Sequence, residues 1–169
     1  MILTAFTILH VILSLVAIGS GFVVVAGLLA SKRPGGSTAL FWTTAVATTF
    51  TGFLFPFRGF TPAIGLGIVS AFVLAIGLAA LYRFGLAGGW RRTYAITAVI
   101  ALYLNMFVLV VQLFEKVPAL KELAPTQSEP PFQIAQLVVL VVFAVLGVQA
   151  VRKFHGEPMN TPKTRTAKA

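Results

Sequence analysis

The sequence predicts an all-α protein: a polytopic membrane helical bundle of five transmembrane helices, with its N-terminus outside and its C-terminus inside the cell. Of its 169 residues, 58% are hydrophobic and 10% are charged, whereas soluble domains have about 45–50% apolar and about 25% charged residues. The apolar runs have about 20 residues, the length of a membrane-crossing helix, and do not show the short alternation of barrel strands. The basic residues are divided unequally between alternate loops, which predicts the orientation.

The apolar runs define a single transmembrane domain, residues 1–151. The predicted spans are about residues 2–30, 38–55, 62–82, 93–114 and 132–151. The span at 38–55 is the shortest and contains six threonines, so a re-entrant segment is the alternative for it. Residues 152–169 are polar and basic without periodicity, and we expect a disordered cytoplasmic tail there.

The division of Lys and Arg predicts the direction in which the chain crosses the bilayer. Ten of the thirteen fall in the loops after the first and third spans and in the tail, and three fall in the other loops. Because loops rich in Lys and Arg stay in the cytoplasm, we expect an odd number of crossings with the N-terminus outside. Aromatic residues support this prediction, since Trp and Tyr gather at membrane interfaces. Four of the five lie at the predicted inner interface: Trp42, Tyr82, Trp90 and Tyr94.

A short turn between the second and third predicted spans sets the depth of both. Pro56 and Pro62 bracket this turn, and Arg58 lies in it among four phenylalanines. Two apolar spans joined so tightly are antiparallel neighbours, and Phe beside Arg suits the boundary between hydrocarbon and headgroups. We therefore expect the turn at the outer surface of the membrane.

Small residues recur at every fourth position along the third span. They are Ala63, Gly67, Ala71, Ala75 and Ala79. Such a ridge lets another helix approach closely in lipid. It predicts a packing face, either within the chain or between two copies in a homo-oligomer.

The longest loop, residues 115–131, has a pattern of its own. Val117, Leu120 and Leu123 fall on one side of a helix. This predicts a short helix at 118–123 that lies on the membrane surface, followed by an extended segment.

Polar side chains within the spans are the candidate binding residues, because polar groups in lipid are costly and tend to face protein or water. At a rise of about 1.5 Å per residue, five of them fall in the outer half of the membrane: His10, Thr48, Asn105, Gln112 and Gln136. We hypothesise that they line a polar pocket with Arg58 at its rim, which the 115–131 loop gates. The pocket would bind a small amphipathic ligand or seat a partner membrane subunit. The alternative is that these residues form hydrogen bonds between helices.

Two other functions stay open from the sequence. In the first, Thr44, Thr48 and Thr51 line the path of a channel or transporter-like oligomer. In the second, His10 holds a haem, alone or with Met106, in an electron carrier. His10 and His155 are predicted on opposite sides of the membrane and cannot share one iron. We expect no metal and no cofactor, with haem as the weaker alternative.

Several function classes lack the residues that they need. The chain contains no cysteine and no aspartate, which excludes thiol chemistry and disfavours a proton-coupled pump. It has no paired carboxylates, metal-ligand spacing or nucleophile–base motif, so an enzyme is the least favoured function. Its net charge of +9 lies at helix ends and in the tail, which indicates membrane topology and not nucleic-acid binding.

Two motif stretches carry a resemblance. Residues 52–63 contain Gly-Phe-Leu-Phe-Pro-Phe, and residues 123–132 read Leu-Ala-Pro-Thr-Gln-Ser-Glu-Pro-Pro-Phe. In these stretches the chain resembles small multi-pass integral membrane proteins of bacteria that have no assigned activity, and the likeness extends over nearly all the spans. The resemblance implies a location in the bacterial inner (cytoplasmic) membrane. It assigns no catalytic residue.

Overall fold

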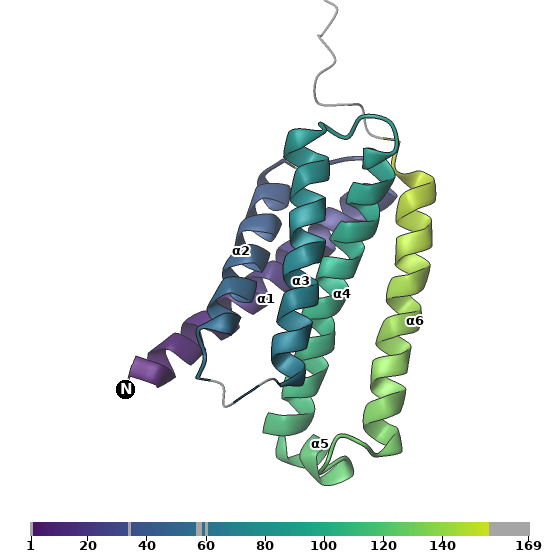
Figure 1. Cartoon of the computed structure of the whole chain (residues 1–169). Helices are drawn as coiled ribbons and strands as arrows, with labels where there is room; N and C mark the ends of the chain where they lie inside the picture. Colours follow the sequence, from purple (N-terminus) through teal and green to yellow (C-terminus); the bar gives the residue numbers. More distant parts are fainter. Residues whose placement is uncertain (1, 34, 57–58, 60, 156–169) are drawn as a thin grey trace, which may run out of the picture.

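The computed structural model describes residues 2–33, 35–56, 59 and 61–155, with side chains from residue 4 onward, and every regular element in them is helical (Figure 1). The elements are α1 (Ile2–Leu29), α2 (Gly35–Phe53), α3 (Pro62–Leu78), the π-helical turn η1 (Ala79–Arg83), α4 (Trp90–Lys116), α5 (Pro118–Leu123) and α6 (Pro130–Lys153). The predicted short helix at 118–123 is confirmed as α5. Helix α6 continues through Arg152 and Lys153, the first two residues of the predicted tail.

The five long helices alternate in direction along the bundle (Figure 1). The N-terminus and α5 lie toward one end, and the end of α6 lies at the other. There the backbone N–H of His155 donates a hydrogen bond of 2.9 Å to the Ser31 hydroxyl, which joins the end of α6 to the end of α1. We call this the basic end, because it holds Lys32, Arg83, Arg92 and Arg152.

Four of the helices are long and apolar enough to cross a membrane. They are Thr4–Leu29, Pro62–Arg83, Trp90–Lys116 and Pro130–Lys153. Helix α2 is not among them, although its 19 residues span about 28 Å at the helical rise, because its threonines make it less apolar. It is nevertheless one continuous helix that packs between α1 and α3.

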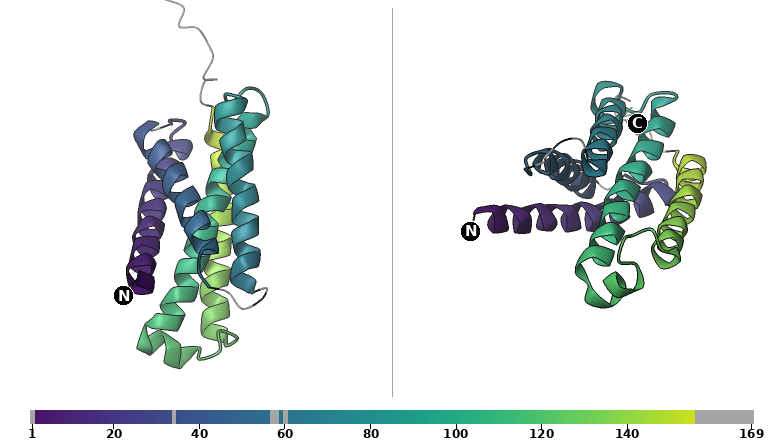
Figure 2. Two further views of the ribbon diagram at one scale, coloured as in Figure 1. Left: turned by 60° about the vertical axis from the view of Figure 1, so that its left-hand side comes forward. Right: turned by 60° about the horizontal axis from the view of Figure 1, so that its bottom comes forward.

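Most of the buried apolar residues in the described part of the chain lie in the half of the bundle toward the basic end. The buried apolar residues of α1 lie between Ala17 and Leu28, and those of α2 lie between Phe41 and Ala45. In the other half the first turns of α1 project away from α4 and α6 (Figure 2). A separate small cluster there joins the end of α4 to the loop after α5. The core therefore joins the five long helices near the basic end.

The small-residue ridge on α3 does not pack within the chain as a whole. Ala63, Ala71 and Ala75 are exposed, and only Gly67 makes a close approach, to Phe53 of α2. The buried face of this segment instead carries Leu74 and Gly77, followed by Ala80 and Leu81 of η1. Of the two alternatives for the ridge, packing within the chain does not hold for most of its residues, and packing between two copies stays a prediction.

Candidate functional site

His10 belongs to a contact between α1 and α2. Its Nδ1 lies 2.8 Å from the Thr51 hydroxyl oxygen, and its ring meets the Phe55 ring edge-on at 5.2 Å. The Thr51 hydroxyl also lies 2.8 Å from the Ala47 carbonyl oxygen, which can only accept a hydrogen bond. Because a hydroxyl has one proton, this arrangement favours a histidine that donates from Nδ1–H. His10 thus ties two helices together.

Gln136 makes the corresponding contact between α6 and α4. Its Nε2 donates to the Phe107 carbonyl oxygen at 3.2 Å, while its buried Oε1 has no partner among the described residues. Asn105 donates to the Ala101 carbonyl oxygen of its own helix at 3.0 Å. Two of these three contacts join helices, and none of them joins α1 or α2 to α6.

The remaining predicted pocket residues do not complete a shared site. The Thr48 hydroxyl is buried without a hydrogen-bond partner in the described part of the chain, and Gln112 is exposed. Arg58 lies outside the described residues. The observed geometry of His10 and Gln136 is that of hydrogen bonds between helices, the alternative considered from the sequence.

Two threonines of α2 bond to their own helix. Thr44 is buried and donates to the Leu40 carbonyl oxygen at 2.7 Å, and Thr51 donates to Ala47 in the same way. Threonine hydroxyls within helices commonly bond to the preceding turn. Two of the three hydroxyls in the predicted stripe are therefore bonded within their own helix, whereas the Thr48 hydroxyl has no partner in the described residues.

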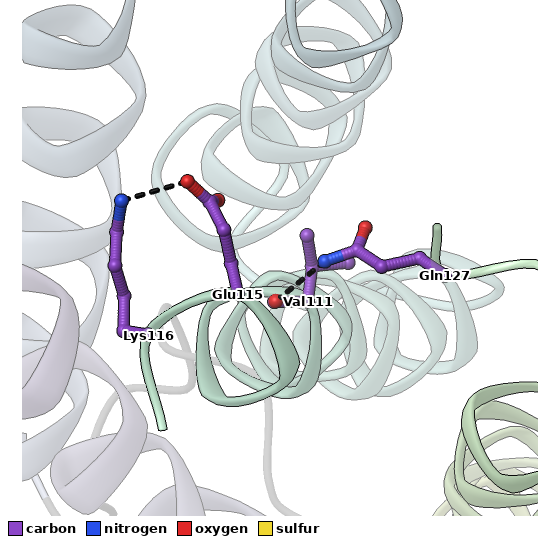
Figure 3. A network of polar contacts seen from close by, with 4 residues as sticks. All are labelled: Val111, Glu115, Lys116 and Gln127. Carbon is purple, nitrogen blue, oxygen red and sulfur yellow. Dashed lines mark hydrogen bonds and ion pairs between the residues drawn. The ribbon is translucent and has the colours of Figure 1, made fainter. Parts of the chain in front are cut away.

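The loop between α5 and α6 is held to the bundle. Gln127 donates from Nε2 to the Val111 carbonyl oxygen of α4 at 3.1 Å, beside the exposed ion pair of Glu115 and Lys116 (Figure 3). Glu129 accepts hydrogen bonds from the backbone and hydroxyl of Thr126. Desolvation acts to raise the pKa of Glu129, but these hydrogen bonds outweigh it and lower the pKa below its ordinary value. The hydrogen bonds of Gln127 and Glu129 therefore hold the loop in one conformation against α4.

An apolar hollow lies between α4 and α6 near the basic end. We call it the α4–α6 groove; it has a volume of about 390 Å³. Its lining residues include Ile96, Val99, Phe143, Gly147, Val148 and Arg152. A second hollow of about 380 Å³ lies on the neighbouring side of α6 and also includes Val148 and Arg152. Arg152 therefore stands at the end of two apolar hollows.

The α4 wall of the groove also leads to a cation. Ile96 and Ile100 are one turn apart, and Arg92 lies one further turn toward the basic end on the same side of α4. Arg92 and Arg152 are both exposed. Arg152 thus lines the α4–α6 groove, and Arg92 lies one turn beyond its lining residue Ile96 on α4. The sequence analysis had used both arginines only to predict topology.

Three polar side chains meet inside the bundle near the same end: Thr38 and Trp42 of α2 and Tyr94 of α4. All three are at most 3% exposed. Trp42 and Tyr94 were predicted at the inner interface as membrane anchors. The structure places them at that end but inside the core, with ring centroids 5.9 Å apart.

The described residues contain no group of three or more His, Cys, Asp or Glu side chains that could hold a metal ion. His10 precedes Ser31 by 21 residues, about 30 Å of helical rise, and Ser31 is bonded to the backbone of His155. The two histidines are therefore too far apart to ligate one iron.

The chain matches no protein-family model, no curated protein and no solved structure. Its function is therefore argued from its own geometry.

Proposed function

We propose that this chain is a five-crossing protein of a bacterial inner membrane, with its N-terminus outside, that binds an anionic membrane lipid in the α4–α6 groove. The role is non-catalytic. The observation that carries the proposal is an apolar groove that ends at Arg152, with Arg92 one turn beyond its other wall.

The proposed threading rests on the position of α2. This helix has 19 residues and lies in the bundle between α1 and α3, so four apolar helices and α2 make five crossings. The hydroxyls of Thr44 and Thr51 bond to the preceding turn, which lowers the cost of placing these two threonines in lipid. The positive-inside rule then places the basic end in the cytoplasm.

The charge of the basic end supports an anionic ligand. Anionic lipids of the cytoplasmic leaflet attract nearby Lys and Arg, and basic pockets between helices on that side bind lipid headgroups. Arg152 lines the groove itself, and Lys153 follows it. An acyl chain fits the walls of Ile96, Val99 and Val148, so one molecule would satisfy both parts of the site.

Weak packing of α6 also favours a lipid neighbour. Of the apolar residues that α6 turns outward, Val141, Val145 and Val148 are at least half exposed. Lipid tails cover this apolar surface without exposing it to water. The phosphate of an anionic lipid adds a charge-assisted hydrogen bond to the arginines.

The test compares the lipids that remain bound after gentle purification. Native mass spectrometry of the wild type should detect anionic phospholipid, and R152Q combined with R92Q should lose most of it. The matched control is R83Q combined with K32Q, which also removes two positive charges from the basic end but at residues that do not line the groove. Equal retention of anionic lipid in the double variant and the control would contradict the proposal.

A further inference from the structure

Two hollows flank one row of side chains on α6, and the proposed function uses only one of them. The second hollow, which we call the α6 hollow, is lined by Ala144, Val145, Val148, Gln149 and Arg152. Three of these residues, Ala144, Val148 and Arg152, also line the α4–α6 groove. They follow one another at intervals of four residues, so they form a single row along the helix. The groove and the α6 hollow therefore lie side by side and meet at Arg152.

Each hollow has the length of a lipid chain in one leaflet. On α6 the groove extends from Phe143 to Arg152 and the α6 hollow extends from Ala144 to Arg152, which is about 12–14 Å at the helical rise. The hydrocarbon core of a bilayer is about 30 Å thick, so one leaflet contributes about 15 Å. The two volumes, about 390 and 380 Å³, are nearly equal. Each hollow thus suits one acyl chain that starts at the level of Arg152.

The α6 hollow also has a polar lining residue next to the arginine. Gln149 precedes Arg152 by three residues on the same side of α6, about 4.5 Å further from the basic end. Both side chains are exposed. In a glycerophospholipid the ester carbonyls lie just below the phosphate, and a glutamine amide can donate hydrogen bonds to such oxygens. Since an amide at the edge of the hydrocarbon is costly without a partner, this position favours an ester-linked ligand.

We propose that the lipid is a diacyl glycerophospholipid whose two chains straddle the row of Ala144 and Val148, one in the α4–α6 groove and one in the α6 hollow. This inference rests on the proposed function. The phosphate binds Arg152, which lines both hollows, and an ester carbonyl accepts a hydrogen bond from the Gln149 amide. A lipid with one chain occupies only one hollow. The site therefore distinguishes lipids by the number of chains as well as by charge.

Native mass spectrometry of the full chain in detergent tests the number of chains. The probes are phosphatidylglycerol and its single-chain lyso form, which carry the same headgroup. We expect the wild type to retain the diacyl lipid several-fold better. V145W should lose most of this preference, because Val145 lines only the α6 hollow and an indole would fill it. The matched control is V138W, which adds the same ring to α6 at a similarly exposed position that lines neither hollow.

Two results would overturn the proposal. One is equal retention of the two lipids by the wild type, and the other is the same preference in V145W and V138W. Circular dichroism shows whether each variant keeps its helical content.

Two further variants separate this inference from the proposed function. R152Q combined with R92Q should lose both lipids. If this double variant keeps both, the proposed function fails; if it loses both but the wild type does not prefer two chains, only the present inference fails. Q149L should lower the retention of the ester-linked diacyl lipid several-fold relative to its ether-linked analogue, which has no ester carbonyls. An unchanged ratio in Q149L would overturn the assignment of Gln149.

Discussion

Gly77 on α3 is the glycine at which we expect an added methyl group to destabilise the fold most. An added Cβ there would lie 2.7 Å from Cζ3 of Trp42 and 2.8 Å from the Thr97 hydroxyl oxygen. Real Cβ atoms do not approach other heavy atoms so closely. The indole of Trp42 has no free space to move into, because Phe41 and Tyr94 pack around it and Trp42 is 2% exposed.

The cost of Gly77→Ala follows from this lack of space. Forcing an extra methyl group into a well-packed core costs about 1–3 kcal/mol. For a chain of this size each kcal/mol lowers the melting temperature by about 2–4 °C. We therefore expect a decrease of about 2–12 °C in a far-UV circular dichroism melt in a single detergent.

The matched control is Gly19→Ala on α1. Nothing lies within 4 Å of a Cβ added at Gly19, so alanine should be neutral or stabilise the helix by about 0.5–1 kcal/mol. Combining Gly77→Ala with Trp42→Phe should recover part of the loss, because the outer ring of the indole is the group that clashes. A Gly77→Ala protein as stable as the Gly19→Ala protein would refute the reasoning.

Three further predictions concern the hydrogen bonds outside the core. Thr51→Val should remove the contact with His10 and cost about 0.6–2 kcal/mol in reversible SDS unfolding; an unchanged midpoint would show that the contact contributes nothing. Because the pKa of Glu129 is lowered in the fold, its contribution is present above the ordinary carboxyl pKa and disappears as the pH falls through the lowered value. Glu129→Gln should abolish this dependence in hydrogen exchange of the loop, and a dependence that persists would assign it to another group. Gln127→Ala should speed exchange at residues 124–129 without changing the melting temperature, since it releases the loop from Val111; slow exchange in this variant would contradict the pinning role.

The helical fold could be predicted from the sequence because it depends on the lengths of apolar runs. The spans at 62–82 and 93–114 differ from the observed helices by only a few residues. Helix α5 was predicted from the positions of Val117, Leu120 and Leu123. These features are local, so the periodicity of one segment is enough to define them.

The arrangement of the polar residues could not be predicted in the same way. His10 and Gln136 were predicted on helix faces with small residues, but the convergence of those faces depends on how the helices cross. The core concentrates near the basic end, and the first turns of α1 project away from α4 and α6 in the other half (Figure 2). The periodicity of one helix does not determine the angle at which it crosses another helix, because that angle depends on the side chains of both.

Trp42 and Tyr94 illustrate the opposite case, a contact that the sequence reading missed. Aromatic residues near the ends of spans usually anchor helices at the interface, and Tyr82, which is 62% exposed, fits that pattern. Trp42 instead lies against Gly77, a glycine that the small-residue ridge did not include. A glycine opposite a tryptophan on a neighbouring span was the one available signal.

The most direct test of the account is the side of the membrane on which each loop lies, because the lipid groove requires the basic end to face the cytoplasm. The chain contains no cysteine, so single-cysteine variants can be labelled in intact cells with a membrane-impermeant maleimide. We predict that P56C and K121C react from outside, and that K32C and K153C react only after permeabilisation. Reaction of K32C and P56C from the same side would show that α2 does not cross, and would contradict both the five-crossing topology and the placement of the groove.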